Sequence, residues 1–235
     1  YGMKIEFSAK VLAGAVATAP VAAIWGLTQY AKRHQGTPEE AARSYPGDDL
    51  VPESPGMGTR AITIDAPPEK VWLLINQLGQ DKAGFYSFSI FERLSHFLIH
   101  NTYEPQVRFQ HTKAGDWIFY GQQGIGSGII EHVPGKYMTT LSDTRKPPTQ
   151  EGAIAWLPAG WKQYAWCWNF HVTELPGGKT RLIFRLGGWG EIDEHHKKLG
   201  IFMNSYLWGW SGTVMTTRML EVLRACAEGK PFIKL

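Results

Sequence analysis

Polar side chains that could do chemistry are spread along the chain and form no recognisable catalytic motif. Catalysis needs a nucleophile, a base and a group that orients the base, all within hydrogen-bonding reach. Neither Ser87 nor Ser89 has the flanking glycines of a hydrolase nucleophile elbow. The sequence therefore predicts no catalytic residue and favours binding. The polar candidates are Tyr86, Glu92, Arg93, His100, Asn101, Asp116, Glu131, His132, Asn169 and His171.

Other common kinds of site are not predicted. Cys167 and Cys226 are the only cysteines and have no metal-ligand spacing, so we expect no metal and no disulfide framework. The run GQQGIGSG at 121–128 lacks the Lys-Ser/Thr of a phosphate loop and predicts a hairpin. The net charge of +3 comes without a continuous basic face, which argues against a nucleic-acid partner. We predict no cofactor.

Two positions are candidates for orienting a ligand. A buried phenol such as Tyr86 seeks a hydrogen-bond partner and could donate to a ligand carbonyl. Glu92 and Arg93 are adjacent on a predicted helix and therefore point in different directions. We expect one of them to enter the interior, the alternative being a charge pair on the surface.

Large apolar side chains give the stronger signal, since the chain has 10 Trp and 13% aromatic residues. Residues 164–172 alternate so that Tyr164, Trp166, Trp168, Phe170 and Val172 share one strand face. Such a face must point into a core or a cavity. We expect a cavity, the alternative being an ordinary core. The candidate ligand-lining residues are Tyr86, Glu92, Trp117, Trp166, Trp168, Phe170, Trp208, Met215 and Met219.

Hydrophobic periodicity predicts an α+β order of elements. A strand near residues 61–65 is followed by helices over 68–78 and 89–99. The period then changes to two, which is typical of strands separated by Gly and Pro turns. We expect strands at 116–120, 128–133, 136–141, 164–175 and 179–186, and a long closing helix at 205–228.

Three features resemble the START-like, or SRPBCC, superfamily, which includes Bet v 1 relatives and polyketide cyclase/dehydrase-like proteins. They are ITIDAPPEKVW at 62–72, PGGKTRL at 176–182 and the closing helix. GFYS at 84–87 and Glu92-Arg93 resemble a membrane-tethered bacterial subgroup. The resemblance implies a helix-grip fold, an antiparallel sheet around a long C-terminal helix with an apolar cavity. Family members bind lipids, sterols, polyketides or hormones, and some catalyse cyclisation or dehydration, so the fold alone does not decide function.

The N-terminal segment predicts a transmembrane anchor. Residues 11–31 carry no charged side chain, and Trp25, Tyr30 and Arg33 suit the membrane interface. A cleavable signal peptide ending near residue 19 is the alternative. Small residues spaced four apart favour packing against another transmembrane subunit. We expect an anchor at 1–33, a linker at 34–58 with a short helix starting near Thr37, and the START-like domain at 59–235.

These features together predict a single-pass protein of the cell membrane. The slight excess of basic residues after the anchor favours a cytoplasmic domain. We expect that domain to bind a hydrophobic small molecule such as a lipid, isoprenoid or pigment. The alternatives are an accessory subunit of a membrane complex and a cyclase/dehydratase-type enzyme. The expected partners are the membrane, the small molecule and other transmembrane subunits.

Overall fold

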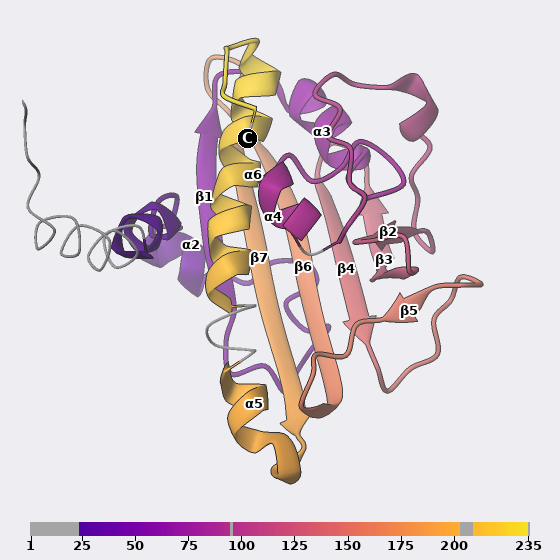
Figure 1. The fold of residues 1–235 in the computed structure, drawn as a ribbon. Helices are drawn as coiled ribbons and strands as arrows, with labels where there is room; N and C mark the ends of the chain where they lie inside the picture. The colour runs from indigo at the N-terminus through magenta and orange to yellow at the C-terminus, as the bar shows by residue number, and fades with distance from the viewer. Residues whose placement is uncertain (1–23, 95, 203–208, 235) are drawn as a thin grey trace, which may run out of the picture.

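The computed structural model describes residues 24–94, 96–202 and 209–234 (Figure 1). A helix at residues 24–31 comes first. The elements that follow are α2 (Pro38–Ala42), β1 (Gly58–Ile64), α3 (Pro68–Asn76), α4 (Ser89–Leu94), η1 (Val107–Phe109), β2 (Trp117–Phe119), β3 (Ile125–Val133), β4 (Tyr137–Asp143), β5 (Ile154–Ala155), β6 (Trp161–Leu175), β7 (Lys179–Ile192), η2 (Glu194–His196), α5 (Lys197–Phe202) and α6 (Trp210–Glu228).

In the described part of the chain, seven strands form one sheet in the order β1-β7-β6-β4-β3-β2. All pairs on this path are antiparallel, and β5 adds a short parallel pairing to β3. The predicted β6–β7 hairpin is confirmed. Gly177 and Gly178 turn it with φ of 81° and 69°, values that suit a tight hairpin turn and that only glycine adopts at little cost.

Helix α6 lies along the inner face of the sheet, as the helix-grip arrangement requires (Figure 1). Its residues Val214, Leu220 and Leu223 have 1% or less of their surface exposed. Leu220 and Leu223 join Phe170 and Phe184 of the sheet in one contiguous hydrophobic cluster. The predicted antiparallel sheet with a closing C-terminal helix is therefore confirmed.

Helix α4 is shorter than the predicted helix over residues 89–99. It ends at Leu94, because His96 adopts a left-handed φ of 58°. The N–H of Phe97 bonds to the carbonyl of Glu92, and the N–H of His96 bonds to that of Arg93. These two bonds are those of a Schellman cap, in which a left-handed residue stops the helix. The chain beyond the cap is free to turn back towards β2 and β3.

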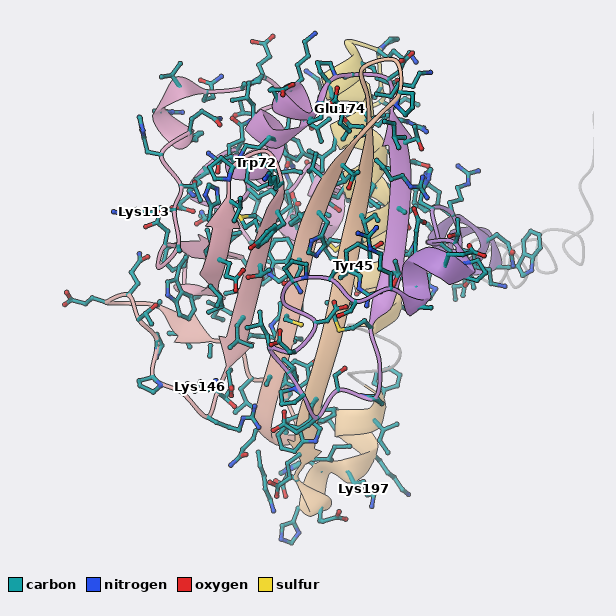
Figure 2. The ribbon with its side chains drawn as sticks, turned by 180° about the vertical axis from the view of Figure 1, so that it is seen from behind. Tyr45, Trp72, Lys113, Lys146, Glu174 and Lys197 are labelled. Carbon is teal, nitrogen blue, oxygen red and sulfur yellow. The ribbon has the colours of Figure 1, made fainter. Side chains whose placement is uncertain are left out.

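Residues 34–57, predicted as a linker, lie across the outer face of the sheet (Figure 2). Arg185 of β7 forms a two-pronged ion pair with Asp48, at 2.6 and 3.0 Å. Val51 is 1% exposed and packs with Ala165 and Cys167 of β6. The short helix predicted to start near Thr37 is confirmed as α2, which has a capping box between Thr37 and Glu40. This segment is thus part of the folded domain.

The helix at residues 24–31 is fixed to α6. The Tyr30 hydroxyl donates to Glu221 at 2.8 Å, and His34 Nε2 lies 3.1 Å from the same carboxylate. Arg60 of β1 donates to the carbonyl of Ala31. Residues 1–23, most of the predicted transmembrane anchor, lie outside the described residues. Within the described ranges, no helix combines the length and the apolar character needed to cross a bilayer.

Candidate functional site

Aromatic rings gather on the inner face of the sheet, beside α4. Trp166 stacks on Trp168 with ring centroids 6.3 Å apart and planes 7° from parallel. Tyr120 lies 5.5 Å from Trp166, and Phe85 lies 6.1 Å from Trp168. We call this group the aromatic wall. Its members are Phe85, Tyr120, Trp156, Tyr164, Trp166 and Trp168.

The wall follows from alternation on β6 and from glycines on β7. Gly188 pairs with Trp166, and Gly190 pairs with Tyr164. A Cβ at Gly190 would lie 2.5 Å from the Trp161 ring and 2.7 Å from the Tyr164 ring. The glycines therefore leave the room that the neighbouring rings fill. Trp168 is buried, whereas the other five members of the wall are half-buried and keep some exposed surface.

Polar groups within the wall are incompletely paired. The Tyr120 hydroxyl bonds to Ser127, and burial raises the pKa of this phenol. The indole N–H of Trp166 is buried and has no hydrogen-bond partner in the described part of the chain. An unpaired buried donor costs about 1–3 kcal/mol. An acceptor on a bound molecule would remove that cost.

Glu92 is a buried carboxyl group next to the wall. It is 1% exposed, and its Oε2 accepts from Asn101 Nδ2 at 3.2 Å, while Oε1 has no partner among the described residues. Desolvation raises the pKa of Glu92 to about 7, against the opposing influence of Asn101 and Arg93. Asn101 Oδ1 in turn accepts the backbone N–H groups of Phe85 and Tyr86, at 3.0 and 2.7 Å. Asn101 therefore ties the carboxyl group to the base of the wall.

Tyr86 has a fully occupied hydroxyl. It accepts from Gln77 Nε2 at 2.7 Å and donates to the Leu74 carbonyl at 3.2 Å. The side chain is 0% exposed, and burial raises its pKa. Here Tyr86 secures the loop before α4 to α3.

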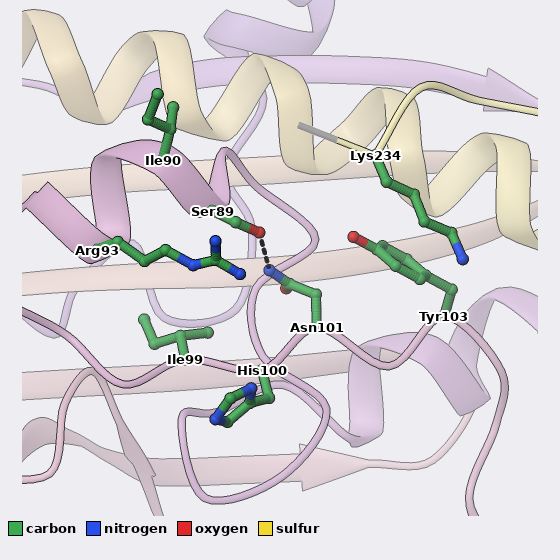
Figure 3. Close-up of a pocket in the computed structure, with 8 residues that line it drawn as sticks. All are labelled: Ser89, Ile90, Arg93, Ile99, His100, Asn101, Tyr103 and Lys234. Atoms are coloured by element: carbon green, nitrogen blue, oxygen red, sulfur yellow. Dashed lines mark hydrogen bonds between the residues drawn. The ribbon is translucent and has the colours of Figure 1, made fainter.

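A pocket of about 440 Å³ opens beside α4 (Figure 3). Arg93 and Ser89 enter it from α4, Asn101 and Tyr103 from the following loop, and Lys234 from the C-terminal tail. Ile90, Ile99 and His100 complete the lining. The cationic groups of Arg93 and Lys234 make the pocket electropositive.

The remaining predicted ligand residues occupy three kinds of position. Phe170 and Met219 are at most 5% exposed and belong to the core cluster, so they fill the space between sheet and helix with side chains. Trp117 lies on the face of β2 opposite the core residue Ile118, and its indole donates to Thr149 at 3.0 Å. Met215 is half-buried on α6. Trp208 lies outside the described residues.

Sequence reasoning missed several residues of the wall and the pocket. Tyr120 directly follows β2 and lies two positions after the core residue Ile118, so alternation could have identified it. Phe85, Tyr103 and Lys234 lie in loops or in the tail, where no periodicity places a side chain. In the described ranges, no group of three or more His, Cys, Asp or Glu side chains is arranged to hold a metal ion.

Comparison with known proteins gives structural similarity alone. No protein-family model matches the chain, and no curated protein matches it. Similar solved structures include protein MLL2253 from Mesorhizobium loti, with 18% identity over 74% of this chain and 99% of that chain and a TM-score of 0.36. The hypothetical protein jhp0584 from Helicobacter pylori has 7% identity over 77% of this chain and 96% of that chain, with a TM-score of 0.39.

The protein Ara h 8.0201, which is Bet v 1-like, has 11% identity over 72% of this chain and 97% of that chain, with a TM-score of 0.30. The helix-grip assignment rests on this chain's own elements. These are the antiparallel sheet, the small helices α3 and α4, and the closing helix α6.

Proposed function

We propose that this protein binds a hydrophobic small molecule against the aromatic wall. The observation that carries the proposal is Trp166. Its ring is half-buried, stacked on Trp168 and faced by Tyr120, and its buried N–H has no partner in the described part of the chain. A ligand with an apolar body and one hydrogen-bond acceptor would satisfy both features. A lipid, isoprenoid or pigment has that chemistry.

Apolar contact would supply most of the affinity. Covering apolar surface contributes about 25 cal/mol per Å², or roughly 2.5 kcal/mol for each 100 Å². Rings such as Trp166 and Tyr120 offer large flat surfaces for such contact. The hydrogen bond to the indole would fix the orientation of the ligand.

We place this activity beside the bilayer of the cell membrane. Residues 11–31 have the length and composition of a single transmembrane span. The helix at 24–31, which is the C-terminal part of that segment, is fixed to α6 through Glu221 and to β1 through Arg60. A span that ends in this helix would hold the domain near the membrane, where hydrophobic ligands reside. The basic residues after the span favour the cytoplasmic side.

The test is binding of the neutral dye Nile red, followed by its fluorescence. Trp166→Ala should weaken binding about tenfold, because it removes the ring at the centre of the wall. Trp189→Ala is the matched control, since Trp189 is half-buried in the small cluster on the outer face. Equal dye affinity in both variants would argue against the wall as the binding site.

A second candidate function is that of an accessory subunit in a membrane complex. Its support is the helix at 24–31, where Ile24 and Trp25 are 57% and 66% exposed. Exposed apolar side chains on a fixed helix suit contact with another protein in the membrane. Co-migration with a stoichiometric complex from native membranes would favour this function, and isolation as a single chain would count against it.

A further inference from the structure

Two cationic side chains, those of Arg93 and Lys234, line the pocket beside α4. Arg93 extends from α4 towards Asn101, whereas the ammonium of Lys234 lies beside the Tyr103 ring, on the side away from Arg93 (Figure 3). Lys234 Nζ lies 5.0 Å from the centre of the Tyr103 ring. Within residues 24–94, 96–202 and 209–234, neither cation pairs with a carboxylate within 4.0 Å. Both charges are thus available to a ligand.

Neutral donors face the same space. Ser89 Oγ accepts from Asn101 Nδ2 at 3.3 Å, which leaves the serine O–H free to donate. The Tyr103 hydroxyl has no hydrogen-bond partner among the residues the structure describes. The Arg93 guanidinium can bind an anionic group by charge-assisted hydrogen bonds, and the two hydroxyls can donate to the same group.

Among the described residues, the pocket lining contains no carboxylate. The neighbouring acid, Glu92, is buried behind Asn101, which donates to it. Desolvation raises its pKa to about 7, so much of its negative charge is absent at neutral pH. Ile90, which is 58% exposed, and Ile99 add apolar surface at one side. The lining therefore combines positive charge with a short apolar patch.

We propose that this pocket binds an organic anion, with a carboxylate or phosphate group held by Arg93, Ser89 and Tyr103 and a short apolar chain against Ile90. Its volume of about 440 Å³ falls within the range of small-molecule sites. The site is separate from the aromatic wall, because none of the wall's rings lines it. The inference therefore stands without the function proposed above.

Isothermal titration of the full chain at low salt, with four probes, tests the proposal. Octanoate and octyl phosphate carry the anion and the chain, octanol carries the chain alone, and inorganic phosphate carries the anion alone. At least one of the two amphiphilic anions should bind about tenfold or more tightly than octanol, because the charge-assisted bonds are absent for the alcohol. The tighter of the two identifies the anionic group. Stronger binding of inorganic phosphate would instead indicate a free phosphate site.

Two variants locate the site. Arg93→Gln should weaken binding of the anion about five- to thirtyfold, Tyr103→Phe should weaken it less, and both should leave octanol binding unchanged. Lys136→Gln, which removes an exposed charge in the β3–β4 turn, is the matched control and should bind as the wild type does. Tyr103→Phe removes only a hydroxyl group, so this variant keeps the test valid if Arg93→Gln folds poorly.

Either of two results would overturn the proposal. One is that no anion binds more tightly than octanol. The other is that the Arg93 and Tyr103 variants bind the anion as the wild type does. Trp166→Ala should leave anion binding intact, so failure here is distinguishable from failure of the aromatic wall.

Discussion

Glu92 carries one of the least exposed carboxyl groups of the described chain, and this burial determines the pH range in which the group loses its proton. Its pKa is raised to about 7, mainly by desolvation, although Asn101 and Arg93 favour the charged form. Between about pH 4.5 and 7 the folded state therefore holds a proton that the unfolded state has lost. The contribution of this group to the free energy of unfolding falls as pH rises through that window, and the loss is complete above it.

Glu92→Gln should remove this pH dependence. The amide oxygen still accepts from Asn101, and no charge is buried at high pH. We expect the variant to match the wild type near pH 4.5 and to exceed its free energy of unfolding by about 1–2 kcal/mol at pH 8. Urea denaturation across this range measures the difference.

A second buried group, His171, changes the free energy of unfolding with pH in the opposite direction, and comparison with the wild type cancels its contribution. Burial lowers the pKa of His171 to about 4, so that group destabilises the fold as pH falls from 6.5 towards 4. His171 is present in both proteins, and its contribution cancels. A constant difference between variant and wild type from pH 4.5 to 8 would contradict the assigned titration of Glu92.

At the scale of elements, the pairing of β6 with β7 shapes the aromatic wall. Tyr164 and Trp166 alternate onto the inner face, and Gly188 and Gly190 stand opposite them. The strand alternation of β6 was predictable from the sequence, because five large side chains recur with period two. The role of the β7 glycines was not predictable, because it depends on the register in which β6 and β7 pair.

Gly190→Ala should disturb the wall. The new Cβ would lie 2.5 Å from the Trp161 ring, so the ring must move. We expect a loss of about 1–3 kcal/mol in the free energy of unfolding, together with weaker Nile red binding. Gly56→Ala is the control, because nothing lies within 4 Å of its Cβ position. Unaltered dye binding in Gly190→Ala would show that the glycine does not set the position of the rings.

The helix at residues 24–31 depends on a small number of polar contacts with α6. Glu221→Ala removes the acceptor of both Tyr30 and His34. Backbone amides of residues 24–34 should then exchange with deuterium faster, while those of β6 and β7 stay protected. Glu174→Ala, at an exposed position of β6, should change neither region. Equal protection in the two variants would mean that other contacts hold the helix.

The parts of the fold that the sequence predicts depend on residues close together in the chain, whereas the parts that it does not predict depend mainly on residues far apart. Hairpins and amphipathic helices depend on neighbours, and their signals survive in the sequence. The ion pair of Asp48 with Arg185 joins positions 137 residues apart, so no local sequence pattern predicts it. The end of α4 was also hidden, because histidine rather than glycine takes the left-handed position in its cap.

Across the whole molecule, segments pack on both faces of the sheet. Helices α6 and α4 lie on the inner face, and residues 34–57 cross part of the outer face (Figures 1 and 2). The core residues Phe170 and Met219 fill the space under α6. The half-buried rings beside α4, Trp166 and Tyr120, are therefore the part of the interior best placed to meet a hydrophobic molecule.

Native mass spectrometry of the full chain, isolated from its own cells in mild detergent without added lipid, tests this placement most directly. We expect one lipophilic molecule bound per chain, retained in Trp189→Ala and lost in Trp166→Ala. An empty chain that takes up nothing from a lipid extract of the same cells would contradict it.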